Sequence, residues 1–290
     1  MATTATFCPR VTVDSVAADS VTVEVGGREL KISSPDKVFF KTNGETKLDL
    51  VRYYEAVEGP ILAALRGRPT LLQRFPDGAH GKSFFQKRVP DSAPDWLETA
   101  VVSTPNGTTS NALVVADLAH LVWAVQIGCL GFHPWPYLAT DPESTDELRI
   151  DLDPSPGVTF DQVREAALET RTLFEELGIT SYVKTSGSKG LHVYVRLRPG
   201  WDSFDVRRAA VSVARELEKR RPDLITGQWW KEERGERVFV DFNQNAPHKT
   251  VFGTWCVRPR VGGQVSCPIR WDEVDTVEPD RVTLDVVPAK

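Results

Sequence analysis

The strongest constraint on the fold is the order of hydrophobic patterns between residues 147 and 242. This stretch divides into six segments in the order strand, helix, strand, strand, helix, strand, at 147–152, 159–177, 181–185, 191–197, 204–219 and 237–242. Alternating apolar and polar residues indicate half-buried strands, and apolar residues spaced by three or four indicate amphipathic helices. The order β-α-β-β-α-β predicts the ferredoxin-like plan that RRM-type modules use.

The remaining residues predict shorter or less regular elements. Gly26-Gly27 separates alternating runs at 21–25 and 29–32, which predicts a hairpin. Helical spacing of apolar residues covers 48–62 and again 113–130, and a strand is predicted at 70–75. The least patterned segments are predicted as a loosely held arm, a long surface loop and a turn-rich tail that wraps back across the first half, at residues 1–20, 76–95 and 243–290.

Composition excludes several classes of protein. The formal net charge of −5 argues mildly against non-specific nucleic-acid binding, although a local basic groove can coexist with an acidic remainder. Since no apolar run approaches the roughly 20 residues of a membrane span and no signal-peptide pattern is present, we expect a cytoplasmic protein. The scattered Cys8, Cys129, Cys256 and Cys267 indicate neither a disulfide framework nor a structural zinc site.

Three aspartates are the candidate metal ligands. Asp151 and Asp153 lie two apart on a predicted strand, so their side chains share one face, about 7 Å apart along the backbone. Carboxylates this close repel unless a cation lies between them, and hard oxygen ligands suit Mg²⁺ or Mn²⁺. Asp241 ends the neighbouring predicted strand, and three carboxylates are enough for two divalent ions. The alternative is a solvated strand end for the pair and a strand-end cap for Asp241.

The turn Thr185-Ser186-Gly187-Ser188-Lys189-Gly190 is the second chemical element. Its small residues leave backbone N–H groups free to surround an anion, and Lys189 adds a point charge. The spacing is not that of a Walker A loop, and the segment precedes a strand instead of a helix. His192 on the outgoing strand is then a candidate phosphate donor. The alternative is an ordinary hairpin turn followed by a structural histidine.

Three segments together resemble the signatures of a known superfamily. They are Asp151-Leu152-Asp153-Pro154, Thr185-Ser186-Gly187-Ser188-Lys189-Gly190-Leu191-His192 and Val238-Phe239-Val240-Asp241-Phe242-Asn243-Gln244-Asn245. They are similar to the three signatures of the archaeo-eukaryotic primase superfamily, and in particular to the polymerase domain of bacterial ligase D, the end-joining ligase. The resemblance runs from about Lys31 to Glu273, with further matching pieces such as Arg74-Phe75-Pro76-Asp77-Gly78 and Val257-Arg258-Pro259-Arg260.

The resemblance implies a primase-polymerase fold of the α/β (α+β) class, in a single domain spanning residues 1–290. An RRM-like, ferredoxin-like catalytic core at 147–242 would pack on an N-terminal DNA-binding α/β module at 31–140. Residues 1–30 would form an N-terminal arm and hairpin, and residues 243–290 a C-terminal wrap.

The resemblance also implies roles for individual residues. Asp151, Asp153 and Asp241 would be the catalytic acids and would bind two divalent ions, Mn²⁺ or Mg²⁺. The NTP or dNTP substrate would be bound by His133, Ser186, Gly187, Ser188, Lys189, Gly190, His192, Gln244, Arg258 and Arg260. DNA would be bound by a lysine pair at a 5′-phosphate, a phenylalanine pair on the template strand and two further basic residues, namely Lys37, Lys47, Phe84, Phe85, Arg74 and Lys87.

Parts of this assignment have simpler alternatives or depart from the family. Without the resemblance, the phenylalanine pair would be interpreted as an ordinary core pair and the lysine pair as surface charge. Gln73 stands where family members often have a basic residue, so one template or phosphate contact is expected to be missing. Pro247 and His248 lie in a stretch where small or basic residues are common.

The implied function is a template-dependent DNA/RNA nucleotidyltransferase that fills short gaps at DNA breaks, preferring ribonucleotides, in end joining or excision repair. Its partners would be DNA with a gap, recessed end or break that carries a 5′-phosphate, a separate ATP-dependent DNA ligase in trans, and a Ku-type end-binding protein. We expect no membrane partner, and nucleoid association in a bacterium. The alternatives are a metal-dependent nuclease or phosphatase, and a non-catalytic DNA-end-binding module that recruits a ligase.

Overall fold

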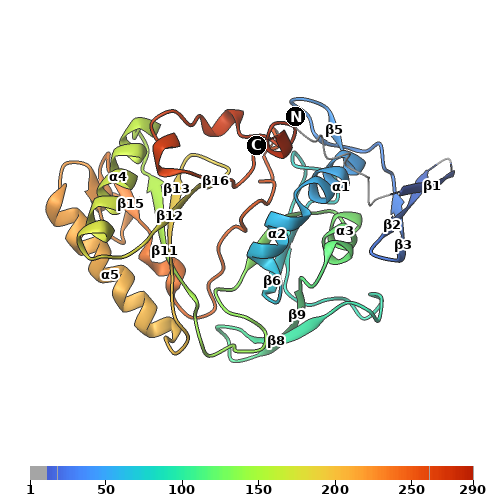
Figure 1. The fold of residues 1–290 in the computed structure, drawn as a ribbon, viewed down its shortest axis with the longest axis horizontal. Coiled ribbons are helices and arrows are strands. Elements are labelled where there is room, and N and C mark those ends of the chain that lie inside the picture. Colours follow the sequence, from blue (N-terminus) through green and yellow to red (C-terminus); the bar gives the residue numbers. More distant parts are fainter. Residues whose placement is uncertain (1–11, 18, 261, 290) are drawn as a thin grey trace, which may run out of the picture.

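Two groups of secondary structure lie side by side, each around its own large hydrophobic core (Figure 1). The computed structural model describes residues 12–17, 19–260 and 262–289. One group contains the helices α1 to α3, and the other contains α4, α5 and a mixed sheet. The mixed α/β class predicted from the sequence is confirmed.

The six-stranded sheet holds the segment that the sequence constrains most. Its strands follow the order β14-β15-β11-β13-β12-β16. They are β11 (Glu147–Pro154), β12 (Tyr182–Thr185), β13 (Leu191–Arg196), β14 (Ile225–Thr226), β15 (Val238–Val240) and β16 (Pro268–Ile269). The four inner strands are antiparallel and have the order of a ferredoxin-like sheet, as predicted. The edge strands β14 and β16 were not predicted, because a run of two residues carries no periodicity.

Two long helices cover one face of this sheet (Figure 1). Helix α4 (Phe160–Glu176) begins with a capping box between Thr159 and Gln162, and α5 (Ser203–Arg220) begins at the cap Asp202. Leu148, Ile150 and Leu152 of β11 pack against their apolar sides. Because side chains alternate along a strand, the polar residues of β11 face the other half of the molecule.

The N-terminal half contains three smaller sheets and three helices. A three-stranded sheet is formed by β1 (Thr12–Ala17), β2 (Ser20–Val25) and β3 (Arg28–Ser33), and β4 (Val38–Phe40) pairs with β5 (Glu45–Thr46). A third sheet has the order β10-β6-β9-β8, with β7 paired to β6. Its strands and the helices are β6 (Pro69–Arg74), β7 (Phe84–Gln86), β8 (Thr99–Ser103), β9 (Thr109–Val114), β10 (Cys129–Pro134), α1 (Lys47–Ala56), α2 (Glu58–Leu65) and α3 (Leu118–Gln126).

Two helix predictions were wrong in extent. The helix expected at 48–62 is interrupted at Val57 between α1 and α2, because Pro60 has no N–H to donate and its ring would clash with the carbonyl four residues earlier. The helix expected at 113–130 is α3 alone. Its first residues belong to β9, Asp117 caps the helix, and Gly128 at φ +83° follows its end.

Two segments expected to be irregular contain strands. Residues 12–17 of the predicted arm form β1, which pairs with β2, while residues 1–11 lie outside the described range. The predicted loop 76–95 contains β7, which pairs with β6. Both strands lie at sheet edges, where backbone pairing supplies stability that a weak side-chain pattern does not reveal.

The C-terminal segment contacts both halves. Phe252, Cys256 and Val265 belong to the N-terminal core, while β16 pairs with β12 in the six-stranded sheet. Of the short helical turns, α6 (Lys231–Arg234) lies between β14 and β15, and η1 (Phe242–Asn245) follows β15. The C-terminal segment contains η2 (Trp271–Glu273), η3 (Pro279–Arg281) and η4 (Val287–Ala289). Within the described ranges no helix is long and apolar enough to cross a membrane.

Candidate active site

The three predicted acids meet on the uncovered face of the six-stranded sheet. Asp151 and Asp153 come from β11, and Asp241 directly follows the adjacent strand β15. The N–H of Asp241 donates to the carbonyl of Asp151 at 2.8 Å, which fixes the two strands in register. One carboxylate oxygen from each residue lies within 4.8 Å of the others. This spacing allows a shared cation.

The electrostatics of this acid cluster favour a cation. Burial raises the pKa of Asp151 to about 6. Burial and the charge of Asp151 raise the pKa of Asp153 to about 6, and the same two causes raise the pKa of Asp241. The Oδ1 atom of Asp151 is buried and makes no hydrogen bond within the described residues. The three acids therefore fit Mg²⁺ or Mn²⁺, which would replace both the lost solvation and the missing partner.

A cleft of about 350 Å³, here called the nucleotide cleft, opens beside Asp151 and Asp153. Its volume is that of a small-molecule site. Most of the residues predicted to bind the nucleotide line it together with Asp151 and Asp153, namely His133, Ser186, Ser188, Lys189, His192, Gln244 and Arg258. Three of its walls, Thr250, Val251 and Phe252, were not predicted, because they carry no chemical signature in the sequence.

The predicted phosphate turn joins β12 to β13 at one end of this cleft. Two of its N–H groups are not free as expected: those of Ser188 and Gly190 donate to the Ser186 hydroxyl at 3.2 and 3.1 Å. That hydroxyl folds back over its own turn, as serine side chains commonly do. Within the described residues the N–H groups of Gly187 and Lys189 make no such bond, so they are the amides left for an anion.

Two neutral histidines contact the nucleotide cleft. Burial and the nearby charge of Arg258 lower the pKa of His133 to about 3, and its Nε2 is buried without a hydrogen bond. Burial and the charge of Lys184 lower the pKa of His192 well below its usual range. The Nε2 of His192 lies 3.2 Å from Asp151 Oδ1, and its Nδ1 lacks a partner among the described residues. Buried polar atoms without partners are costly, which favours a polar ligand here.

The remaining predicted nucleotide residues surround this centre. Gln244 donates to Asp241 Oδ2 at 2.8 Å, and the guanidinium of Arg258 lies 4.4 Å from the ring centroid of Phe252. Arg260 is exposed and donates to the Ser188 hydroxyl. These contacts connect the C-terminal segment to the phosphate turn.

The predicted DNA contacts lie on the N-terminal half. Phe84 and Phe85 are 47% and 56% exposed, so they are not a core pair. The ring of Phe85 meets that of His133 edge-on at 5.5 Å, which places the phenylalanine pair at the rim of the nucleotide cleft. Arg74 lies against Phe84 and donates to the carbonyl of Ile127 at 2.7 Å, and Lys87 is exposed.

The two members of the predicted lysine pair differ in burial, since Lys37 is exposed and Lys47 is enclosed. Lys47 is buried and donates to Ser33 O and Gln126 Oε1 at 2.9 and 2.8 Å. Lys37 donates to the carbonyl of Pro76 at 2.6 Å and pairs with Asp77. Burial and the charge of Lys37 lower the pKa of Lys47 to about 8. Two cations held close together favour an anionic ligand.

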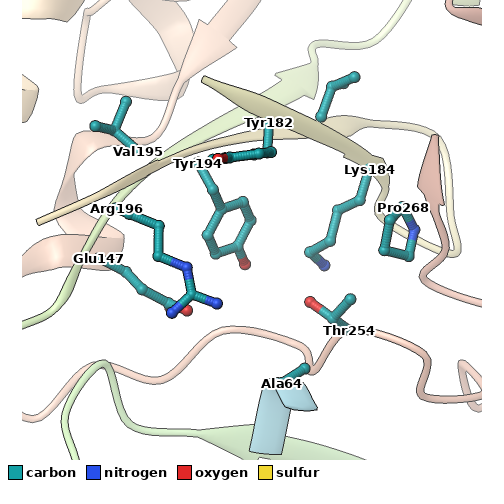
Figure 2. Close-up of a pocket in the computed structure, with 10 residues that line it drawn as sticks. Ala64, Glu147, Tyr182, Lys184, Tyr194, Val195, Arg196, Thr254 and Pro268 are labelled. Carbon is teal, nitrogen blue, oxygen red and sulfur yellow. The ribbon is translucent and has the colours of Figure 1, made fainter. Parts of the chain in front are cut away.

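A second cavity of about 330 Å³ lies farther along the same strands, between Ala64 of α2 and the sheet (Figure 2). Figure 2 shows the Tyr194 hydroxyl and the Lys184 ammonium pointing into it. Lys184 is buried, and it donates to the carbonyl of Phe252 at 3.1 Å. Its charge offsets part of the rise that burial causes in the pKa of Asp151, and burial lowers its own pKa to about 7. Sequence reasoning missed this residue, whose only signal is a lysine within the strand that precedes the turn.

Comparison with known proteins identifies the family of the chain. A family described as "LigD, primase-polymerase domain" matches residues 46–290. The chain is 34% identical over 260 residues to the multifunctional non-homologous end joining protein LigD of Mycolicibacterium smegmatis, covering 89% of this chain and 34% of that protein. For the bifunctional LigD of Bacillus subtilis the values are 32% over 261 residues, 89% and 42%. The chain therefore spans less than half the length of these relatives.

A solved structure of a ligase D polymerase domain also matches the chain. The polymerase domain of Mycobacterium tuberculosis ligase D in complex with DNA matches with a TM-score of 0.84 and 31% identity, over 90% of this chain and 93% of that one. These matches confirm the resemblance inferred from the acid, turn and strand motifs. The chain belongs to the LigD primase-polymerase domain family.

Proposed function

We propose that this protein is a template-dependent nucleotidyltransferase that extends primer 3′ ends at DNA breaks. The observation that carries the proposal is the nucleotide cleft, where Asp151 and Asp153 face the phosphate turn with its Lys189. Relatives named for non-homologous end joining support a role in that pathway. The DNA bound to the matching polymerase domain supports DNA as a substrate.

The acid cluster would hold the divalent cations. Asp151, Asp153 and Asp241 offer oxygen ligands within 4.8 Å of one another, which suits two ions of Mg²⁺ or Mn²⁺. Such ions, when bound, activate the attacking oxygen and neutralise charge on the leaving phosphate.

The protein's own groups would bind and orient the reactants. In the reaction, the primer 3′-oxygen bonds to the α-phosphorus, the bond to the β-phosphate oxygen breaks, pyrophosphate leaves, and the hydroxyl proton passes to solvent. Lys189 and the free amides of the turn would bind the triphosphate, because charge-assisted hydrogen bonds to phosphate are the strong ones. The neutral His133 and His192 would donate to the nucleotide without adding charge beside the acids.

The DNA would lie across both halves. Phe84 and Phe85 would stack on template bases, and Lys37 and Lys47 would bind the 5′-phosphate at the far side of a gap. We infer from this arrangement that short gaps with a 5′-phosphate are the preferred substrate. From the family resemblance alone we infer that ribonucleotides are the preferred nucleotides. A separate ATP-dependent ligase would seal the product, with a Ku-type protein holding the ends.

A primer-extension assay tests the proposal. The substrate is a labelled primer on a short gap with a 5′-phosphate, incubated with NTP or dNTP and with Mn²⁺ or Mg²⁺. We expect extension by the wild-type chain, faster with NTP, and loss of at least 10³-fold in Asp151→Ala. The matched control is Asp161→Ala on the solvent side of α4, which should extend at the wild-type rate.

Other outcomes would point to other functions. Metal-dependent shortening of the primer would assign a nuclease, and a shift in DNA mobility without any change in length would assign a binding module. Equal activity in Asp151→Ala and wild type would show that the acid cluster is not the reaction centre.

A further inference from the structure

A third cavity, also open, lies beside Asp153 and Asp241. Its volume is about 470 Å³, and Asp153, Asp241, Trp229, Trp230 and Phe239 are among its walls. We call it the tryptophan cavity. Asp153 lines both cavities, so the acid cluster forms the wall that they share.

Two adjacent tryptophans make the wall of this cavity aromatic. Trp229 is 46% exposed and Trp230 is 64% exposed. Large aromatic side chains are seldom left this open side by side in a soluble protein, and exposed apolar patches commonly mark binding sites. Every base has a π-face, so indole rings bind nucleobases by stacking without reading their sequence.

The tryptophan segment is anchored to the strand that positions the third acid. Arg234 donates to the carbonyl of Trp229 at 2.8 Å, and its guanidinium lies 3.5 Å from the ring centroid of Phe239 on β15. The Trp229 ring contacts those of Phe239 and Phe242, at centroid distances of 6.5 and 6.2 Å. Asp241 lies between these two phenylalanines in the sequence. The cavity is therefore positioned relative to the acid cluster by the same backbone.

The side of the acid cluster on which the tryptophan cavity lies indicates which part of the substrate it would hold. The phosphate turn defines the triphosphate side, and in an in-line displacement the attacking oxygen comes from the side opposite the leaving phosphate. The nucleotide cleft is lined by the turn and by β13, and the tryptophan cavity is lined by β15. Strand β11 with Asp153 runs between β13 and β15, so the tryptophan cavity is on that opposite side. Its wall holds two basic residues, Lys231 and Arg234, against the three acids Asp153, Glu232 and Asp241, so its charge suits a nucleoside better than a second triphosphate.

We propose, on the basis of the proposed function, that the tryptophan cavity binds the 3′-terminal nucleoside of the primer, with an indole of Trp229 or Trp230 stacked on its base. This stacking holds the 3′-hydroxyl beside Asp241. The phenylalanine pair at Phe84 and Phe85, on the other half of the molecule, is left for the template strand.

Steady-state extension with varied primer-template and NTP tests the proposal. Because stacking on an aromatic side chain is lost on substitution by alanine, we expect Trp230→Ala and Trp229→Ala to raise the half-saturating primer concentration, or lower kcat, by about 5- to 100-fold. The KM for NTP should stay within twofold, and Trp230→Phe should recover most of the activity. The matched control is Trp201→Ala, which removes an indole that is 53% exposed outside the three cavities described here.

The outcomes separate this inference from the proposed function. A wild-type chain that does not extend primers contradicts the proposed function. A wild-type chain that extends them, with both alanine variants at wild-type primer dependence, overturns the inference alone. A rise confined to the KM for NTP assigns the tryptophan cavity to the incoming nucleotide and also overturns it.

Photocrosslinking of the wild-type chain tests the same point without a variant. A primer with 5-iodouracil as its 3′-terminal base should crosslink to the peptide that contains Trp229 and Trp230. The same probe placed in the template opposite the gap should crosslink elsewhere. Primer crosslinks to Phe84 or Phe85, or template crosslinks to the tryptophans, would overturn the assignment.

Discussion

At the scale of single residues, the acid cluster lowers the stability of the folded protein when no metal is bound. The pKa of Asp151 is raised from its ordinary 3.8 to about 6 by burial, so the folded protein binds this proton more tightly than the unfolded chain does. The stabilising effect is fully present below pH 4 and is lost as the pH rises through 6. Without metal, the protein should therefore be less stable at pH 7.5 than the Asp151→Asn variant.

We expect Asp151→Asn to raise the free energy of unfolding at pH 7.5 in EDTA by about 1–3 kcal/mol, since one pKa unit corresponds to about 1.4 kcal/mol. Urea unfolding at pH 4 and at pH 7.5 measures it, and the gain should vanish at pH 4. Added Mn²⁺ should stabilise the wild type but not the variant. Asp161→Asn, on the exposed side of α4, should change stability by less than about 0.5 kcal/mol at either pH. A destabilised Asp151→Asn at pH 7.5 contradicts this account.

At the scale of elements, the phosphate turn depends on the absence of a side chain at Gly190. A Cβ there would lie 2.6 Å from the carbonyl oxygen of Leu152 and 3.4 Å from Asp153 Oδ1, so Gly190→Ala would push the turn away from β11. We expect a loss of about 1–3 kcal/mol in stability and a rise of at least tenfold in the KM for NTP. Thermal unfolding and primer extension measure the two effects.

The control for this substitution is Gly59→Ala in α2, where an added Cβ meets nothing within 4 Å. It should leave the KM unchanged and leave stability equal or slightly higher, because alanine favours a helix over glycine. An unchanged KM in Gly190→Ala would show that the turn does not position the triphosphate.

Some of these elements could be predicted from the sequence, and some of their side-chain roles could not. The inner strands of the six-stranded sheet were predicted because their alternation continues over several residues. Ser186 was expected to leave the turn amides open, yet its hydroxyl accepts two of them, since a local side-chain bond competes with any ligand. Lys184 was missed, because its importance comes from the charges that folding places around it.

At the scale of the whole molecule, the two halves would bind different parts of the proposed DNA substrate. The acid cluster lies on the six-stranded sheet, whereas Lys37 and Lys47 lie on the N-terminal half. We expect the wild type to bind a gap with a 5′-phosphate more tightly than one with a 5′-hydroxyl, and Lys37→Ala to abolish that preference. The variant should also reduce the slope of log affinity against log salt by about one, as the loss of one phosphate contact does.

Fluorescence anisotropy of the two gapped DNAs at several salt concentrations measures this preference. Lys41→Ala, an exposed lysine four residues away, is the matched control and should keep the preference. Equal affinity of the wild type for both DNAs would contradict the assignment of the lysine pair.

The pairing of β16 with β12 has a consequence for the order of events during synthesis. Thr185, where the turn begins, donates to the carbonyl of Val265 and accepts from the N–H of Cys267, so the turn is supported by residues about 80 positions later. The nascent chain can assemble its inner strands on the ribosome, but the turn stays unsupported until residues 265–269 have left the exit tunnel. Because contacts between such distant residues form late, the growing chain should acquire nucleotide binding only after its inner strands have paired.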